Sequence, residues 1–277
     1  MAVGHVDFLA KNPEVDIIFL IRPVAEERLE LNCPYMLGYP DYTRMLLKEP
    51  GRKIRSLQVE FRLRPGTKAG QEIEGIFKSE IAEIAEIFGV SYHLVRKEFF
   101  EALKLQKEHE RQVYLNKLLP NGLEQPESPK FRVLALGHSY NLWDNIMSHH
   151  IVSKIIDQGG HVTTKEMLDK ELLSKCAKRG LPKELFWTQS KHLAGAALQA
   201  MNTGSVDGIM FIQSFGCGPD ATITPLLARE AKKAKMPFSI INIDVQTADA
   251  GIDTRVEATA DALIEDILEG RKVRTKC

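Results

Sequence analysis

The sequence predicts an α/β protein with two Rossmann-like domains, each built on a parallel sheet. Continuous apolar runs typical of buried parallel strands recur along the chain, and segments of helical period alternate with them in the second half. A polar stretch containing prolines and a glycine interrupts this pattern at residues 121–130. With 277 residues and 44% hydrophobic content, the chain can bury two cores. We therefore expect a partial N-terminal α/β domain with a helical segment at residues 1–120, a linker at 121–130 and a C-terminal α/β domain at 131–277.

The N-terminal domain is predicted to begin with a short helix over residues 3–11, followed by a buried strand over 16–21. Pro23 follows this apolar run and is expected to stop the strand. Residues 31–41 are rich in turn formers and carry Cys33 just beyond a strand end. We therefore expect a loop that presents this cysteine.

The rest of this domain changes from strand to helix. Apolar and polar side chains alternate over residues 57–64, which is typical of a half-exposed strand at a sheet edge. From residue 71 to about 119 the period becomes helical, with a break at Gly89. A helical pair should therefore follow an incomplete first sheet.

The second domain alternates regularly between strand and helix signals. The predicted strands cover residues 132–136, 162–164, 208–212 and 238–243, and the main predicted helices cover 142–158, 191–202, 221–235 and 254–268. This alternation predicts a parallel sheet with helices on both faces.

Cys217 is the strongest candidate functional residue of the second domain. It follows the buried strand at 208–212, lies between Gly216 and Gly218, and precedes a helix. Glycines permit a sharp bend and the close approach of a bulky group, and a helix N-terminus favours a thiolate over a thiol. Ligands collect beyond the carboxyl ends of parallel strands, and thiolates bind metals and iron–sulfur clusters. The alternative is a small, inert cysteine at a tight turn.

Composition excludes several classes of protein. Lys plus Arg and Asp plus Glu balance at 37 each, so no global charge predicts binding to nucleic acid or to an anionic membrane. No apolar run approaches a membrane span and the N-terminus lacks a signal-peptide pattern, so we expect a cytoplasmic protein. Its widely spread cysteines do not resemble a disulfide framework. Neither a dinucleotide fingerprint nor a P-loop is present, so the sequence does not predict ATP hydrolysis.

A series of motifs in one order carries a family resemblance. They are residues 4–6 (GHV), 19–23 (FLIRP), 33–34 (CP), 38–41 (GYPD), 137–141 (GHSYN) with Asp144, 186–187 (FW), 207–208 (DG), 215–220 (FGCGPD) and 251–255 (GIDTR). With these motifs the chain resembles the acyl-CoA dehydratase activase-related family, DUF2229, which is similar to subunits of 2-hydroxyacyl-CoA dehydratases and benzoyl-CoA reductases. The motif around Cys217 is the most specific part of the match.

The resemblance implies a [4Fe–4S] cluster held by three cysteines between two Rossmann-like domains. It also implies an ATP-dependent activase as the electron-donating partner and an acyl-CoA-type small molecule as substrate. Cys33 and Cys217 are the metal ligands that this sequence retains, and we expect them to face each other across the interdomain cleft. The family's upstream cysteine–proline motif and first strand are missing here. Either the sequence is truncated, or the third ligand is expected from outside this chain, from another chain that supplies the missing N-terminal segment or from an exogenous molecule. The family's acidic pair before Gly251 reads Asp244-Val245, which removes one candidate acid or base.

Further candidates lie on the same predicted loops. His138, Tyr140 and Asn141 follow the strand at 132–136 and are candidate cofactor contacts, although a turn-stabilising role for His138 is equally open. Arg255 lies near a helix start, where a cation needs an anionic partner such as Asp249, Asp253 or a CoA phosphate.

The remaining candidates have structural interpretations. His149 and His150 are expected to be surface histidines within a helix. Trp187 is assigned to packing, and Cys176 and Cys277 have no neighbours that suggest chemistry.

Three functions are compatible with these observations. The first is an iron–sulfur protein that takes part in ATP-activated electron transfer to an acyl-CoA or related substrate. The second is a non-catalytic, degenerate or truncated subunit that acts as an interaction partner without a cluster. The third is a small-molecule binder that uses the sheet edge without a metal.

Overall fold

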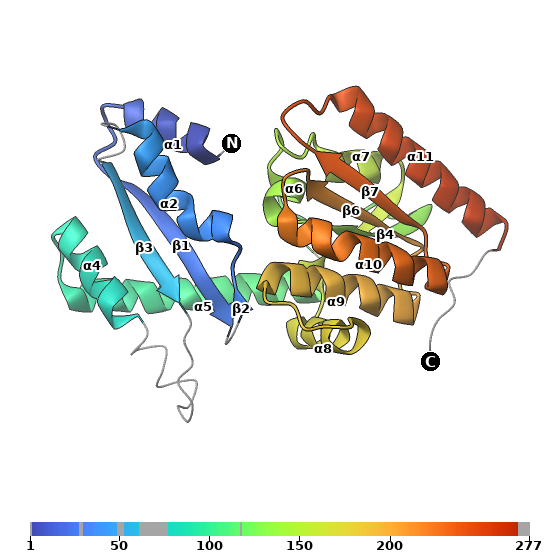
Figure 1. Ribbon diagram of the computed structural model, residues 1–277, viewed down its shortest axis with the longest axis horizontal. Coiled ribbons are helices and arrows are strands. Elements are labelled where there is room, and N and C mark those ends of the chain that lie inside the picture. The colour runs from blue at the N-terminus through green and yellow to red at the C-terminus, as the bar shows by residue number, and fades with distance from the viewer. Residues whose placement is uncertain (1, 28–29, 49–52, 61–76, 117, 271–277) are drawn as a thin grey trace. The chain divides into compact units, whose positions relative to one another are not determined.

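The computed structural model describes residues 2–27, 30–48, 53–60, 77–116 and 118–270. These residues form a mixed α/β structure with two sheets, which confirms the predicted fold class (Figure 1). The chain divides into two compact units, residues 1–107 with 186–188, and residues 108–185 with 189–277. The division lies within helix α5 (Tyr92–Asn116), whereas the predicted boundary at 121–130 stays a prediction. Within the described ranges, no helix has the length and apolar character that a membrane span requires.

The first unit contains a small sheet of strand order β2-β1-β3 (Figure 1). Its elements are α1 (Ala2–Lys11), β1 (Ile18–Glu27), β2 (Glu30–Leu31), α2 (Pro34–Leu47), β3 (Ile54–Glu60), α4 (Lys78–Phe88) and the first part of α5. β1 and β3 are parallel, and the short β2 adds an antiparallel partner. Val6, Ala10, Ile18 and Ile54 form its buried core.

Two local predictions in this unit are wrong. β1 continues through Pro23, which pairs with Val59 of β3. Because β2 meets β1 only from Ala25 onward, Pro23 has a strand neighbour on one side only among the described residues, and proline is tolerated there. The expected loop at 31–41 is largely helix α2, since Pro34 occupies a first-turn position where a missing N–H costs nothing.

The two helices after β3 are separated at Gly89, as the sequence predicted. α4 ends at Phe88, and Gly89 takes a left-handed conformation with φ 63°. Its N–H donates to the carbonyls of Ala85 and Glu86, which caps the helix before α5 begins. Residues 71–76, where the helical period is predicted to begin, lie outside the described residues.

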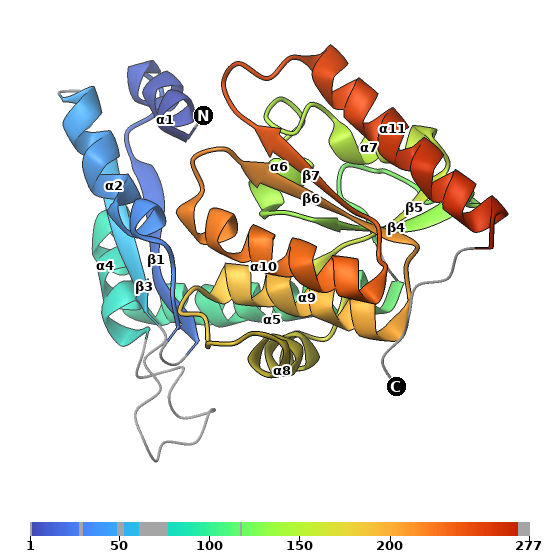
Figure 2. The same cartoon turned by 45° about the vertical axis from the view of Figure 1, so that its right-hand side comes forward.

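The second unit is a four-stranded parallel sheet of order β5-β4-β6-β7 (Figure 2). The strands are β4 (Phe131–Leu136), β5 (Gly160–Thr163), β6 (Gly208–Ser214) and β7 (Phe238–Ile243). The helices are α6 (Ser139–Trp143), α7 (Ile151–Asp157), the 3₁₀ turn η2 (Lys165–Met167), α8 (Lys170–Gly180), α9 (Thr188–Thr203), α10 (Gly218–Ala234) and α11 (Asp249–Leu268).

Alternating side chains of β4 and β6 build two separate cores in this unit. Leu134 and Phe211 face α8, α9 and α10, whereas Val133 and Met210 face α7 and α11. All four side chains are at most 1% exposed. The strands are therefore buried on both faces, as their continuous apolar runs predicted.

The predicted helix over residues 142–158 is interrupted. α6 ends at Trp143, and the Asp144 side chain accepts a hydrogen bond from the Met147 backbone N–H at 2.9 Å. His149 and His150 then adopt left-handed conformations, with φ 52° and 54°, before α7 starts. The expectation of two histidines on a helix surface is therefore wrong, because a side chain that caps a turn has displaced the helix.

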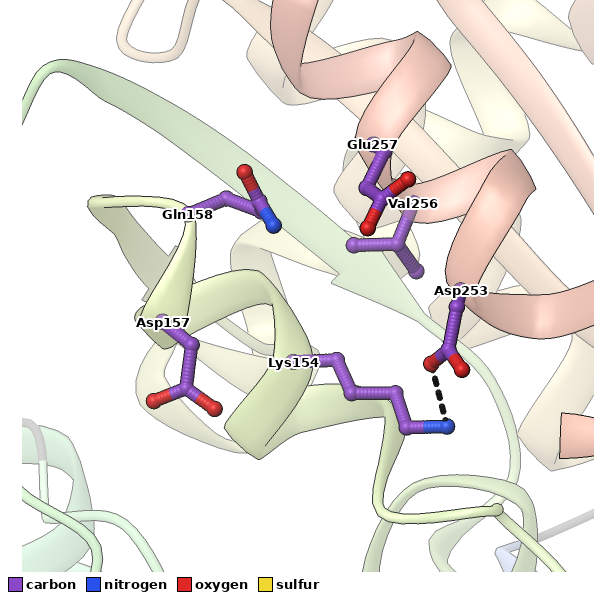
Figure 3. Close-up of a pocket in the computed structure, with 6 residues that line it drawn as sticks. All are labelled: Lys154, Asp157, Gln158, Asp253, Val256 and Glu257. Carbon is purple, nitrogen blue, oxygen red and sulfur yellow. Dashed lines mark ion pairs between the residues drawn. The ribbon is translucent and has the colours of Figure 1, made fainter. Parts of the chain in front are cut away.

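α7 and α11 cover one face of the sheet and line a surface pocket (Figure 3). The pocket is lined by Lys154, Asp157, Gln158, Asp253, Val256 and Glu257. Lys154 Nζ pairs with Asp253 at 2.6 Å and with Asp249 at 3.4 Å. Burial opposes the charge on Lys154, yet the two carboxylates raise the pKa of its ammonium above the ordinary value. These contacts tie the start of α11 to α7.

Replacing glycine by alanine should have opposite effects on the free energy of unfolding at two positions of this unit. A Cβ at Gly195 of α9 would overlap the Leu173 backbone of α8, whereas at Gly251 of α11 it would meet only the end of the Arg255 side chain at 4.0 Å. Gly195→Ala should lower the free energy of unfolding by about 1–3 kcal/mol through overpacking. Gly251→Ala should raise it by up to about 1 kcal/mol through helix propensity. Urea unfolding followed by circular dichroism would measure both, and shifts of the same sign would contradict this packing.

Candidate metal centre

The candidate site lies at the carboxyl edge of the second sheet, on the loops after β4 and β6. β5 lies on one side of β4 and β6 on the other, so the chain reverses its direction of winding between these neighbouring strands. Ligands in open α/β sheets bind at such switch points. His138 follows β4 and Cys217 follows β6, so the strand order brings these two predicted residues together.

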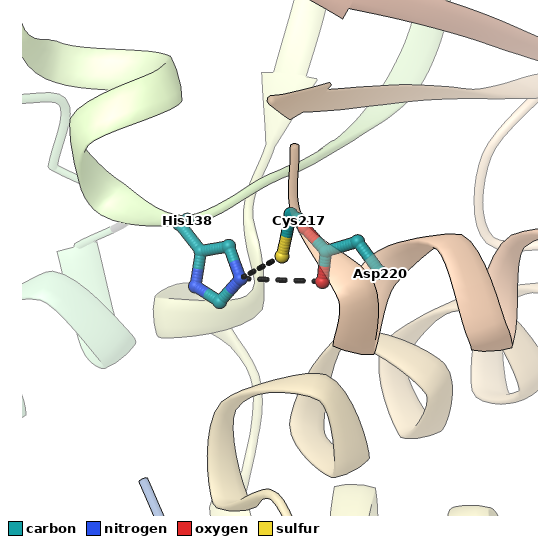
Figure 4. Close-up of side chains that lie close together, drawn as sticks. All are labelled: His138, Cys217 and Asp220. Atoms are coloured by element: carbon teal, nitrogen blue, oxygen red, sulfur yellow. Dashed lines mark hydrogen bonds and ion pairs between the residues drawn. The ribbon is translucent and has the colours of Figure 1, made fainter. Parts of the chain in front are cut away.

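Three donor atoms converge at this point (Figure 4). His138 Nε2 lies 3.9 Å from Cys217 Sγ and 3.2 Å from Asp220 Oδ1. One donor atom from each residue lies within 4.8 Å of the other two. A thiol, an imidazole and a carboxylate form a ligand set that suits transition-metal ions.

The geometry does not match a catalytic triad. In a nucleophile–histidine–carboxylate relay, one ring nitrogen faces the nucleophile and the other faces the carboxylate. Here the same nitrogen, His138 Nε2, faces both Cys217 and Asp220 (Figure 4). The arrangement is therefore better suited to holding one centre than to passing a proton.

Helix α10 positions two of the three donors. Cys217 is its N-cap residue, and the cysteine side chain makes no capping hydrogen bond. Asp220 follows three positions later, on the same side of the first turn, where a carboxylate interacts favourably with the helix dipole. Pro219 occupies the first turn without losing a hydrogen bond.

Asp220 is an unusual residue because its carboxylate is completely buried, at 0% exposure. Oδ1 contacts His138 and accepts a hydrogen bond from Ser190 Oγ at 3.4 Å. Oδ2 is buried and has no hydrogen-bond partner among the described residues. A buried carboxylate with an unsatisfied oxygen is costly, so a compensating group is expected beside it.

Close packing fixes the position of His138. A Cβ at Gly137 would lie 2.7 Å from the Ile212 carbonyl oxygen, so only glycine lets the loop after β4 pass this close to β6. The imidazole then stacks on Tyr140, with ring centroids 5.2 Å apart and an angle of 6° between planes. Tyr140 thereby orients the ring whose Nε2 faces Cys217.

Asn141 fastens the two loops to each other. Its side chain is fully buried, donates to the Ile212 carbonyl at 3.4 Å and accepts from Ser214 Oγ at 2.8 Å. The amide thus spans the ends of β4 and β6. Its predicted contact with a cofactor stays a prediction.

Space remains open on the outer side of Cys217. A Cβ at Gly216 or Gly218 would meet no atom within 4 Å, and Phe215 is 75% exposed. The thiol itself is half-buried. A bulky group can therefore approach the sulfur from outside, as the two glycines suggested.

Cys33 has a similar local setting in the first unit. It is the N-cap of α2, with proline in the first turn and without a side-chain capping bond. Tyr42 packs nearby, and burial followed by the neighbouring Tyr35 and Tyr39 raises the pKa of its phenol to about 12. Cys33 and Cys217 thus each occupy a helix start, and their predicted shared site stays a prediction.

Arg255 is exposed on α11. Asp249 and Asp253, its expected partners, pair with Lys154 instead, and Asp249 also contacts His149 Nδ1 at 2.8 Å. α11 starts at Asp249, five residues before the predicted start, so Arg255 lies beyond the first turn. The role of Arg255 toward an anionic cofactor stays a prediction.

A second polar cluster borders Asp220 through Ser190 of α9. It contains Lys165, Glu166, Lys191 and His192, of which Lys191 and His192 are each 7% exposed. Burial opposes the negative charge on Glu166, but the adjacent Lys165 ammonium holds its pKa below the ordinary value. Burial and then the charges of Lys165, Lys191 and Lys170 lower the pKa of His192 to about 4.

Asp220 is the donor that the sequence analysis missed. The sequence shows it only as the last residue of the motif at 215–220, because its contact partner His138 lies 82 positions away. The signal that identifies it is its spacing from Cys217, since residues at i and i+3 share one side of a helix. Ser190 carried no comparable signal.

Asn141→Ala should destabilise the second unit. The change leaves Ser214 Oγ and the Ile212 carbonyl without their buried partner, which typically costs about 1–3 kcal/mol. Asn202→Ala, at an exposed position of α9, is the matched control and should change the free energy of unfolding by less than about 0.5 kcal/mol. Equal unfolding midpoints in urea for the two variants would refute the structural role of Asn141.

His192 should make stability depend on acid pH. Its pKa is lowered from 6.5 to about 4 in the fold, so between these values the unfolded state binds more protons. The contribution of neutral His192 to the free energy of unfolding is fully present above pH 6.5. It is lost as the pH falls toward 4, by up to about 1.4 kcal/mol per pH unit. The measurement is urea unfolding of wild type and His192→Gln across this range. The difference between the two proteins should change with pH, and parallel curves would contradict the prediction.

Comparison with known proteins identifies the family. The family model described as CoA enzyme activase uncharacterised domain (DUF2229) matches residues 1–168, which is more than half of the chain. Comparison with curated proteins found no match. The matched region includes Cys33 and His138, whereas Cys217 and Asp220 lie beyond it. The chain belongs to the DUF2229 family of CoA enzyme activase-related proteins.

Proposed function

We propose that this chain is an iron–sulfur protein that takes part in ATP-activated electron transfer to an acyl-CoA or related substrate. The observation that carries the proposal is the convergence of Cys217, His138 and Asp220 at the carboxyl edge of the second sheet. Family membership supports a role beside a CoA enzyme activase. The proposed cofactor is a [4Fe–4S] cluster, and the proposed partner is an ATP-dependent activase subunit or domain.

The surroundings of Cys217 fit one attachment point of such a cluster. The N-terminus of α10 favours an anionic ligand, and the open space beside Gly216 and Gly218 admits a bulky group. When bound, an iron–sulfur cluster supplies one-electron transfer at a potential set by its ligands and surroundings. Cys217 would hold the group, and His138, kept in place by Tyr140, would lie beside it.

Among its described residues, the second unit places one thiol, Cys217, at this edge of the sheet. Cys176 lies within α8 and packs against the hydrophobic core, so it does not belong to this edge of the sheet. We therefore assign Cys33, which has the same helix-start setting, as a second ligand, and we propose that a third ligand comes from another chain or a small molecule. The cluster should therefore be incomplete or labile when this external ligand is withheld.

The chain needs an electron donor in this scheme. Its sequence contains no P-loop, so the energy of ATP would be supplied through the activase partner. Asn141, Tyr140 and Arg255 are proposed contacts for the cofactor or for the acyl-CoA-type substrate. Arg255 is suited to a phosphate because it is exposed and forms no ion pair in the described part of the chain.

Anaerobic reconstitution with iron and sulfide tests the proposal. Wild-type protein should take up both elements and develop iron–sulfur absorbance, more completely when a small thiol is added as an external ligand. Cys217→Ser and Cys33→Ser should each lose most of the bound iron. Cys176→Ser, whose thiol lies against the core, is the matched control and should behave as wild type.

Two outcomes would change the assignment. Equal iron and sulfide in all four proteins would remove the cluster and favour a non-catalytic interaction partner. A stable, stoichiometric cluster in wild-type monomer without added thiol would show that no external ligand is required.

A further inference from the structure

We propose that Cys217, His138 and Asp220 form a site for a single divalent transition-metal ion of the zinc or iron(II) type. This site uses only residues of the second unit. It shares Cys217 with the proposed cluster but requires neither Cys33 nor an external protein ligand, so the two proposals can be tested separately.

Two of the three distances between the donor atoms are close to those around one ion, and the third, between Cys217 and Asp220, is at most 4.8 Å. Metal–ligand bonds of about 2.3 Å to sulfur and about 2.0–2.2 Å to nitrogen and oxygen, at tetrahedral angles, separate S from N by about 3.6 Å and N from O by about 3.4 Å. The corresponding separations here are 3.9 Å and 3.2 Å. Each differs from the expected value by about 0.3 Å or less, so small side-chain adjustments would complete the geometry.

The buried carboxylate supplies an independent reason for a cation. Asp220 is 0% exposed, its Oδ2 has no hydrogen-bond partner, and its ion pair among the described side chains is with His138 rather than with a lysine or arginine. Burying such a charge without compensation is strongly unfavourable. A divalent ion between Asp220 and Cys217 would neutralise the carboxylate and the thiolate together.

The imidazole is oriented as a ligand. Nε2 points at both Cys217 and Asp220, and one proton on this nitrogen can serve only one of them at a time (Figure 4). A metal ion in place of that proton contacts both neighbours. The stacked Tyr140 ring limits rotation of the imidazole, which reduces the entropy lost on binding.

The donor set also defines the class of ion. Thiolate and imidazole select zinc, iron and similar ions, whereas calcium and magnesium prefer oxygen ligands. The open space beside Gly216 and Gly218 leaves room for a fourth ligand from solvent or substrate. Three protein ligands with one open position are the usual composition of a reactive zinc site.

Cobalt(II) titration of the reduced, metal-free full-length protein tests the inference. A bound thiolate gives an intense sulfur-to-cobalt charge-transfer band, and the visible bands report tetrahedral geometry. Wild type should bind one cobalt ion with both signatures, and zinc should displace it. Cys217→Ser should abolish the charge-transfer band. His138→Gln and Asp220→Asn should each weaken cobalt binding by at least about tenfold.

Matched variants separate ligation from folding and from the cluster. Cys176→Ser is the cysteine control and should leave the cobalt spectrum unchanged. Circular dichroism should show intact structure, and if Asp220→Asn does not fold, His138→Gln carries the test because the ring is partly exposed. A charge-transfer band that survives in Cys217→Ser would overturn the inference.

The result also distinguishes this inference from the proposed function. If cobalt binding requires Cys33 as well as Cys217, the three-residue site is wrong while a shared cluster site survives. If cobalt binds as expected but reconstituted iron is equal in all cysteine variants, the cluster fails and the single-ion site stands. Absence of specific cobalt binding overturns the inference.

Discussion

The pairing of β4 with β6 is the constraint on which the candidate site depends. Their parallel register, with Leu136 opposite Phe211, brings the loops after both strands to one edge. Gly137 permits this approach, and Asn141 then connects the two strand ends through Ile212 and Ser214. His138 and Cys217 are neighbours because of this packing, although 79 positions separate them in the chain.

Asp220 links this packing to the electrostatics of the site. Its carboxylate is buried where α10 begins, and it contacts His138 on one loop and Ser190 on α9. The nearby cluster holds buried lysines, and burial, followed by the charges of these lysines, lowers the pKa of His192 to about 4.

The sequence predicted the second unit well because its signals are local. Strand 238–243 coincides with β7. In the first unit, the break at Gly89 is local in the same way, because it follows from a backbone preference of glycine. Interactions that the local pattern does not reveal caused the failures. Asp144 caps a turn inside the expected helix, and Pro34 starts α2 where turn formers suggested a loop.

The same limit applies to the site. Cys217 and His138 were identifiable because each follows a strand, and strand ends collect ligands in this class of fold. Asp220 can be recognised as a candidate ligand only from its depth of burial, and this depends on how α9 and α10 pack. The sequence motif at 215–220 contains both Cys217 and Asp220. Only the fold shows that Asp220 is a candidate ligand rather than a carboxylate that merely starts the helix.

The two proposed metal states use one sulfur and therefore compete. A single ion engages Cys217 together with His138 and Asp220, and it satisfies the buried carboxylate. A cluster attached to Cys217 needs further thiolates, which the described residues of the second unit do not place at this edge. The single-ion state thus draws its stability from groups already in position, whereas the cluster must recruit ligands from elsewhere. The metal content of the protein would consequently depend on which ligands and ions it meets first.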